Sequence, residues 1–140
     1  MIVECFLDTN VLIYAAAGRG GEERKRQQAL ELIESTDFGL SAQVLQEFYV
    51  VATRKIEHRL TPDCALEWIE QWEAFPCVSI DCRLVKIAAE LSERFQISYW
   101  DGAVLSAAEA LGAETLYTED LNNGQHYGTI RVSNPFSFAS

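Results

Sequence analysis

Five short apolar segments, separated by longer stretches with helical periodicity, constrain most strongly how this 140-residue chain can fold. They lie at residues 2–7, 38–40, 77–80, 115–118 and 129–133. Short apolar runs of this kind are typical of strands that are buried on both faces of a parallel sheet. Because the runs alternate with helical patterns, the sequence predicts an α/β fold with a mainly parallel central sheet flanked by helices.

The stretches between these strands predict helices with recognisable ends. We expect them at 9–17, 22–34, from Ser41 to Lys55, from Pro62 past Trp72, from Asp81 to Phe95, and at 98–111. Ser41, Thr61 and Asp81 are capping residues, and Gly112 suits the left-handed position that ends a helix. The glycine-rich stretch 18–21 is expected to end the first helix, and residues 119–128 are expected to form a loop.

Length and charge limit the classes of function. A chain of 140 residues fits a single domain, 1–140, with one hydrophobic core. Its formal net charge is -10, from 21 acidic and 11 basic residues. Tight passive binding of nucleic acid needs a basic surface, so this charge argues against it. A nuclease that binds divalent cations on acidic groups remains compatible, because a bound ion inverts the local charge.

The cysteines and the amino terminus suggest the cytoplasm. Cys5 and Cys64 lie in apolar or amphipathic stretches and are interpreted as buried structural thiols, and no C-x-x-C pair is present. The residues that follow Met1 include no basic region and no long apolar stretch of the kind found in secretion signals. The apolar run 11–17 is too short to cross a bilayer. We therefore expect a soluble, cytoplasmic protein that does not enter a membrane.

Four acidic residues draw attention because of their positions in the predicted fold. Asp8 and Asp120 follow predicted strands, where ligand sites of parallel sheets lie. Asp101 falls in the first turn of a helix, and Glu47 lies beside the apolar face of another. Each position has an ordinary explanation: a helix cap for Asp8, a favourable helix dipole for Asp101, a turn for Asp120 and a half-exposed helix position for Glu47.

The positions of these four acids, taken together, nevertheless favour a metal site. Several carboxylates in one cleft repel one another and raise one another's pKa. A hard divalent cation relieves the repulsion, and Mg²⁺ or Mn²⁺ held by a few carboxylates can activate a water molecule. A metal-free nuclease would instead need an acid–base pair, usually two histidines, and nothing pairs His58 with His126. His126 lies near the Asp120 loop and is interpreted as a surface residue.

Four blocks, taken in order, resemble the motifs of PIN-domain proteins. They are Leu7-Asp8-Thr9-Asn10-Val11-Leu12, the isolated Glu47, Tyr99-Trp100-Asp101-Gly102-Ala103 and Tyr117-Thr118-Glu119-Asp120-Leu121. The chain looks closest to the VapC-like toxins of type II toxin–antitoxin pairs, and Arg131-Val132-Ser133-Asn134-Pro135-Phe136 resembles the tail of that group.

The resemblance implies a three-layer PIN fold and a Mg²⁺- or Mn²⁺-dependent endoribonuclease that hydrolyses RNA phosphodiesters by a metal-activated water. It implies that the metal-binding and catalytic acids are Asp8, Glu47, Asp101 and Asp120. Asp8 and Asp101 would be direct ligands, and Asp120 would act through water. Thr118 would orient a water or a ligand, and Asn10 would hold Asp8 in place. Glu119 stays an alternative to Asp120, which better keeps the Thr-x-Asp pattern.

The resemblance also implies partners: an RNA substrate, a VapB-like antitoxin and a second copy of the chain. The basic clusters Arg24-Lys25-Arg26 and Arg54-Lys55 with Arg59 are interpreted as solvated faces that could still guide RNA. Trp68 and Trp72 share a helix face, which more often packs in a core.

Two alternatives compete with the nuclease. A phospho-receiver module would need a lysine after a late strand, whereas Lys25, Lys55 and Lys86 all fall in predicted helices. A PIN scaffold that binds RNA or a protein partner without cleavage remains open.

Overall fold

A six-stranded sheet forms the centre of the computed structural model, which describes residues 2–17 and 22–137. Its strands are β1 (Cys5–Leu7), β2 (Phe38–Ser41), β3 (Cys77–Val78), β4 (Thr115–Tyr117), β5 (His126–Tyr127) and β6 (Ile130–Ser133). Their spatial order is β3-β2-β1-β4-β6-β5, and only β5 runs antiparallel to its neighbour. The predicted α/β fold with a mainly parallel sheet is confirmed.

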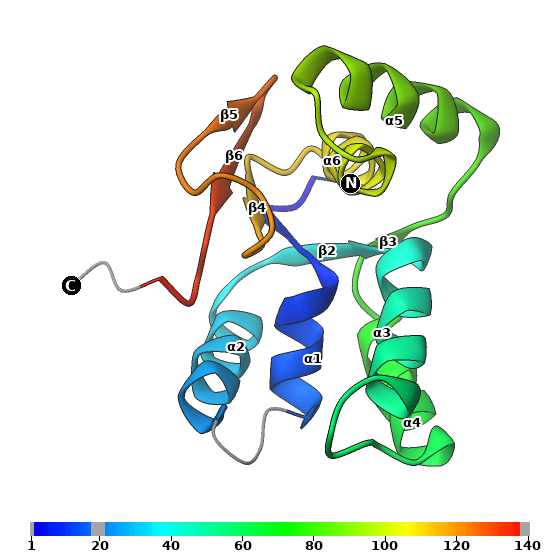
Figure 1. Ribbon diagram of the computed structural model, residues 1–140, viewed down its shortest axis with the longest axis vertical. Coiled ribbons are helices and arrows are strands. Elements are labelled where there is room, and N and C mark those ends of the chain that lie inside the picture. Colours follow the sequence, from blue (N-terminus) through cyan, green and yellow to red (C-terminus); the bar gives the residue numbers. More distant parts are fainter. Residues whose placement is uncertain (1, 18–21, 138–140) are drawn as a thin grey trace.

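Helices cover both faces of this sheet. They are α1 (Thr9–Ala17), α2 (Glu23–Ser35), α3 (Ala42–Arg54), α4 (Pro62–Trp72), α5 (Cys82–Phe95) and α6 (Tyr99–Ala110). Figure 1 shows α1 to α4 on one side of β2 and β3, with α5 and α6 on the other. The chain steps from β1 to β2 and β3 in one direction and then returns past β1 to β4, so right-handed crossovers place the two helix groups on opposite faces.

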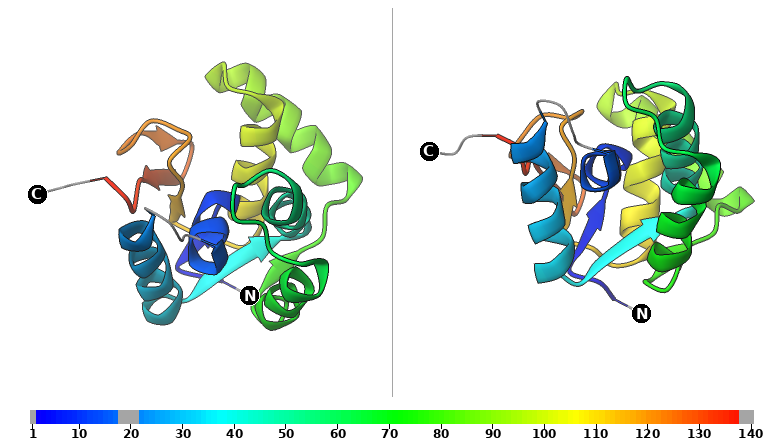
Figure 2. Two further views of the ribbon diagram at one scale, coloured as in Figure 1. Left: turned by 60° about the horizontal axis from the view of Figure 1, so that its bottom comes forward. Right: turned by 90° about the horizontal axis from the view of Figure 1, so that it is seen from below.

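Within the larger group, α1 lies between α2 and α3, as the view from below makes clear (Figure 2). None of the helices in the described part of the chain combines the length and the apolar character that a membrane span requires.

The expected capping bonds are present: the side chains of Ser41, Thr61 and Asp81 accept hydrogen bonds from N–H groups in the first turns of α3, α4 and α5. Gly112 adopts φ 70° after α6, as expected. The turn predicted at 18–21 lies outside the described residues.

The strands supply the centre of the core, as their apolar sequences predict. The fully buried strand residues include Phe6, Leu7, Phe38, Leu40, Leu116, Ile130 and Val132. Trp72 is buried and packs edge-on against Phe48, which confirms the interpretation of its helix face as core, whereas Trp68 is half-buried. Cys5 is buried as expected, but Cys64 is only partly buried. All four cysteines lie in the described part of the chain, and all are free thiols.

The structure departs from the sequence prediction in the segment after β4. Residues 119–128 are not entirely loop, because His126 and Tyr127 form β5. Gly128, at φ 66°, turns the chain back so that Tyr127 pairs with Ile130 of β6. Tyr127 is 2% exposed, and its burial holds this short strand in place. Two residues are too few to produce a recognisable alternation in the sequence.

Gly102, in the first turns of α6, permits the close packing of α6 against α5. A Cβ atom at this position would overlap the Ala88 carbonyl oxygen and would lie 3.2 Å from the backbone nitrogen of Ser92. Both are backbone atoms of α5 and cannot move aside as a flexible side chain would. The absence of a side chain at Gly102 therefore sets where the start of α6 lies.

We predict that Gly102→Ala lowers the free energy of unfolding by about 2 kcal/mol, because overpacking outweighs the roughly 1 kcal/mol that alanine adds through helix propensity. Urea denaturation measures the change. Glu90→Ala, on the exposed surface of α5, is the control and should change stability by less than about 0.5 kcal/mol. A Gly102→Ala protein as stable as the wild type would contradict this account of the helix contact.

Candidate functional site

Asp8 lies at the carboxyl end of β1, where the chain passes into α1. Its N–H donates to the carbonyl oxygen of Tyr117 at 3.1 Å, which continues the pairing of β1 with β4. The carboxylate is 6% exposed and accepts two hydrogen bonds of 2.7 Å, from the Thr9 N–H and from the Thr118 hydroxyl. One bond ties Asp8 to the start of α1, and the other ties it to the segment after β4.

This burial changes the acidity of Asp8. Its pKa rises from 3.8 to about 6, chiefly because burial penalises the charged carboxylate. The negative charges of Asp120 and Glu47 raise the pKa as well, and the two hydrogen bonds that Asp8 accepts oppose the rise. No lysine or arginine of the described residues forms an ion pair with Asp8. The carboxylate is therefore a buried acid that has no cationic partner among the residues that the structure describes.

Asp120 follows β4 and lies beside Asp8. The Thr118 hydroxyl, which is fully buried, donates to Asp8 and accepts the Asp120 N–H at 3.1 Å. The Asn10 side chain donates to Asp120 Oδ2 at 3.3 Å. The structure thus places Thr118 and Asn10 next to the acids that they were expected to support, although Asn10 contacts Asp120 rather than Asp8.

The adjacent acids Glu119 and Asp120 face different partners. Glu119 accepts hydrogen bonds from the Tyr14 hydroxyl at 2.8 Å and from Lys25 Nζ at 3.4 Å. Its charge does not contribute to the raised pKa of Asp8, whereas that of Asp120 does. Of the two alternatives that the sequence left open, the structure brings Asp120 toward Asp8.

Glu47 reaches the same edge of the sheet from α3. Its Oε1 accepts hydrogen bonds from the Thr9 hydroxyl at 3.4 Å and from Gln43 Nε2 at 3.2 Å. The Gln43 nitrogen also donates to the Trp100 carbonyl oxygen at 3.4 Å, so this side chain links α3 to the start of α6. Gln43 was not singled out from the sequence, although its position four residues before Glu47 on one helix gave a signal.

Asp101 completes the group from the first turn of α6. Its N–H donates to the Ser98 hydroxyl, which caps the helix. Burial raises the pKa of Asp120 and the charge of Asp101 raises it further, so these two carboxylates lie within electrostatic range. Asp101 does not follow a strand. The helix α5 precedes it, and a left-handed residue, Gln96 at φ 55°, turns the chain between them.

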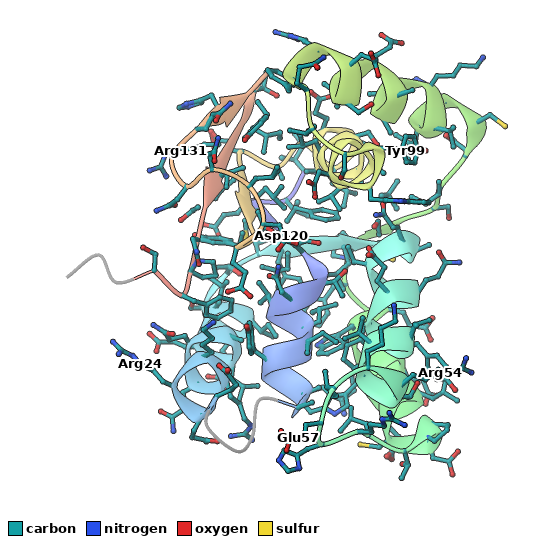
Figure 3. The ribbon with its side chains drawn as sticks, in the orientation of Figure 1. Arg24, Arg54, Glu57, Tyr99, Asp120 and Arg131 are labelled. Carbon is teal, nitrogen blue, oxygen red and sulfur yellow. The ribbon has the colours of Figure 1, made fainter. Side chains whose placement is uncertain are left out.

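The four acids therefore lie near one another, within electrostatic range in pairs, where the strand order reverses between β1 and β4, which is the usual ligand site of such sheets. A pocket of about 560 Å³ opens here and includes Glu47 and Asp120 in its lining. Figure 3 shows Asp120 near the start of α1 and Glu57, another lining residue, near its far end, so the pocket follows the helix. Its wall contains apolar side chains such as Ile13, Val51 and Ile56.

The two histidines do not pair. His58 lines the pocket, whereas His126 is exposed on β5 at the edge of the sheet. The contribution of His58 to the pocket was missed, because no local pattern in the sequence places the turn after α3 beside α1.

The donor set suits a hard divalent cation. In the described residues no three carboxylate, histidine or cysteine side chains are gathered closely enough to hold one ion as they stand. Mg²⁺ needs fewer, since it commonly binds one or two carboxylates and keeps several waters. Asn10 Oδ1 and Gln43 Oε1 are buried oxygen atoms without a hydrogen-bond partner, which is unusual and marks both as available acceptors beside the acids.

Similar proteins share this architecture. The family model of the PIN domain matches residues 5–125, a range that includes all four acids. No curated protein sequence matches the chain. Among solved structures, the sarcin-ricin loop cleaving toxin VapC20 of Mycobacterium tuberculosis has 21% sequence identity and a TM-score of 0.65, over 84% of this chain and 90% of that one.

Two complexes are similar as well. A toxin-antitoxin complex from Klebsiella pneumoniae has 18% identity and a TM-score of 0.71, with 95% of this chain and 98% of that chain covered. The DNA-bound VapBC of Salmonella typhimurium has 18% identity and a TM-score of 0.64, with coverage of 96% and 99%. At such low identities the likeness establishes a common fold. Because the family model spans most of the sequence, this chain belongs to the PIN domain family.

Proposed function

We propose that this protein is a Mg²⁺- or Mn²⁺-dependent endoribonuclease and the toxin of a type II toxin–antitoxin pair. The proposal rests above all on the buried carboxylate of Asp8, which has no cationic partner in the described ranges 2–17 and 22–137 and lies near three further acids where the strand order reverses. Such a group of like charges favours a hard cation. Membership of the PIN family and likeness to VapC toxins support a nuclease that acts on RNA.

Each acid has a proposed part in holding the cation. Asp8 and Asp101 would hold the cation directly, Glu47 would complete the set, and Asp120 would act through a water molecule. When bound, the cation supplies a nucleophile from water at neutral pH and offsets the charge that develops on the phosphate oxygens. Hydrolysis of this kind leaves a 5′-phosphate and a 3′-hydroxyl.

The surrounding side chains keep these acids in position. Thr118 fixes one oxygen of Asp8, and the oxygen atom keeps a second lone pair for another partner. Gln43 sets Glu47 relative to the first turn of α6, because one amide nitrogen bonds both. Misplacement of a carboxylate by about 1 Å can cost on the order of 100-fold in rate, which makes such restraints part of the catalytic machinery.

RNA must approach a protein with a net charge of -10. Arg54, Lys55 and Arg59 are exposed at the end of α3 and in the turn that follows, next to the pocket residues Ile56 and His58. We propose that this basic group attracts the phosphate backbone toward the acidic end of the pocket.

The pocket and the surface of α3 and α4 suggest where partners bind. The apolar wall and acidic rim of the pocket suit an antitoxin segment that combines apolar and basic side chains. The complexes of similar structures with antitoxins support such a partner.

A second, apolar depression on α3 and α4, with Tyr49, Val50 and Leu66, is a candidate surface for a homodimer. We propose that the protein acts on RNA in the cytoplasm.

A PIN scaffold that binds RNA or a protein without cleavage is the remaining alternative. The presence of all four acids favours the nuclease, since a scaffold has no need to keep an uncompensated buried carboxylate. The activity experiment separates the two, because a scaffold binds labelled RNA and leaves its length unchanged.

We predict that Mn²⁺ supports cleavage of labelled single-stranded RNA, that chelation abolishes it, and that Asp8→Asn lowers kcat by more than about 100-fold. Gel analysis of the products measures the rate, and circular dichroism verifies folding. Asp63→Asn, the same substitution at an exposed position on α4, should retain full activity. Cleavage that survives both chelation and Asp8→Asn would refute the metal mechanism.

We also predict that the metal-free protein loses stability as pH rises from about 4 to 6. The folded-state pKa of Asp8 is about 6 and its ordinary value is 3.8, so the folded state binds the additional proton in this window. The two-unit shift corresponds to at most about 3 kcal/mol.

In the presence of chelator at pH 7, Asp8→Asn should therefore be more stable than the wild type by about 1–2 kcal/mol, after the cost of an altered bond to Thr118. Urea denaturation between pH 4 and 8 measures both effects, and an Asp8→Asn protein less stable than the wild type at pH 7 would contradict them.

A further inference from the structure

Both carboxylate oxygens of Glu119 are held from outside the proposed metal site. The Tyr14 hydroxyl on α1 donates to Oε1 at 2.8 Å, and Lys25 Nζ on α2 forms an ion pair with Oε2 at 3.4 Å. Lys25 also donates to the Tyr14 hydroxyl at 3.2 Å, which closes a triangle of polar contacts. Glu119 is thus attached to two helices, α1 and α2.

Aromatic side chains pack around this triangle. Lys25 Nζ lies 4.8 Å from the centre of the Tyr14 ring and 5.7 Å from that of Phe136, near the described end of the chain. The two rings meet edge-on, with their centres 4.8 Å apart. We call Tyr14, Lys25, Glu119 and Phe136 together the Lys25 brace. It joins α1, α2, the segment after β4 and the segment after β6.

The brace is next to an acid, Asp120, whose side chain is held by a single hydrogen bond. Asp120 is exposed at the surface, although partial burial of its carboxylate raises its pKa, and its side chain accepts one hydrogen bond of 3.3 Å from Asn10. Its position depends on the residues before it: Thr118 is tied inward to Asp8, and Glu119 is tied outward to Tyr14 and Lys25. Opposite anchors on two consecutive residues fix the backbone from which the Asp120 side chain projects.

Electrostatic repulsion acts against that position. Burial raises the pKa of Asp120 most, and the charges of Asp101 and Glu119 raise it further. The charges of Asp120 and Glu47 likewise contribute to the raised pKa of Asp8. Asp120 would relieve this repulsion by turning away from the other acids. The residues that follow, 122–126, are exposed, but backbone hydrogen bonds such as that from the Gly124 N–H to the Val132 carbonyl oxygen hold them against β6. These bonds restrain the segment after Asp120, and the brace restrains the segment before it.

We propose that Lys25 and Tyr14 are positioning residues which, through Glu119, hold Asp120 in the metal site against the repulsion of the other acids. The proposal rests on the proposed metal-dependent function. It also changes the interpretation of Lys25, which the sequence placed in a basic cluster that faces solvent. Partners that orient metal ligands in this way typically contribute about 10- to 100-fold to metal affinity.

The test is direct Mn²⁺ binding by the full chain without RNA, measured from the free-ion signal in electron paramagnetic resonance. The double variant Lys25→Met with Glu119→Gln removes the brace, preserves net charge and retains an apolar side chain over Tyr14 and Phe136. We expect it to bind Mn²⁺ about 10-fold more weakly than the wild type. Tyr14→Phe, which changes no charge, should weaken binding by a smaller factor, about threefold, and Lys25→Arg should bind nearly as the wild type does.

A matched ion pair on the same helix provides the control. Glu23 and Arg26 pair at 3.0 Å on the surface of α2, and Glu23→Gln with Arg26→Met also preserves net charge. This control should bind Mn²⁺ as the wild type does.

Thermal unfolding of the metal-free proteins tests a merely structural role, which would lower the melting temperature of the brace variant and leave its Mn²⁺ affinity unchanged. That result overturns the proposal, whereas a wild-type protein that binds no Mn²⁺ overturns the metal site itself and the brace with it.

Discussion

The parallel pairing of β1 with β4 is the constraint on which the site depends. It brings Asp8, at the end of one strand, within 2.7 Å of the Thr118 hydroxyl, just beyond the end of the other. The strand order reverses at this pair, so helices from both faces of the sheet begin or pass nearby. Glu47 arrives on α3 from one face and Asp101 on α6 from the other, although 54 positions separate them in the sequence.

Like charges gathered in this way cost stability, and hydrogen bonds hold them together. Burial and repulsion raise the pKa of Asp8 to about 6, and neutral donors, rather than lysine or arginine side chains, surround it in the described part of the chain. Neutral donors fix a carboxylate without neutralising it, which leaves its charge available to a cation. The one nearby lysine, Lys25, pairs with Glu119 and so acts on the site through the backbone of the β4 exit.

Local patterns account for what the sequence predicted, and long-range packing accounts for what it missed. Ser41, Thr61 and Asp81 each begin a helix and Gly112 follows the end of one, through contacts with a few neighbouring residues, and their positions were predicted correctly. The motifs around Asp8, Asp101 and Asp120 identified the acids that meet. The bridge from Gln43 to Trp100, the entry of His58 into the pocket and the partners of Glu119 join segments far apart in sequence, so no local pattern could predict them.

The central claim is that the acids at the β1–β4 edge share a divalent cation. A crystal structure of the protein with Mn²⁺, with an anomalous difference map recorded at the manganese absorption edge, tests it most directly. The account predicts a peak within coordination distance of Asp8 and Asp101, with Asp120 linked to it through water. A saturated crystal in which Mn²⁺ occupies other positions and leaves Asp8 without a metal contact would contradict it.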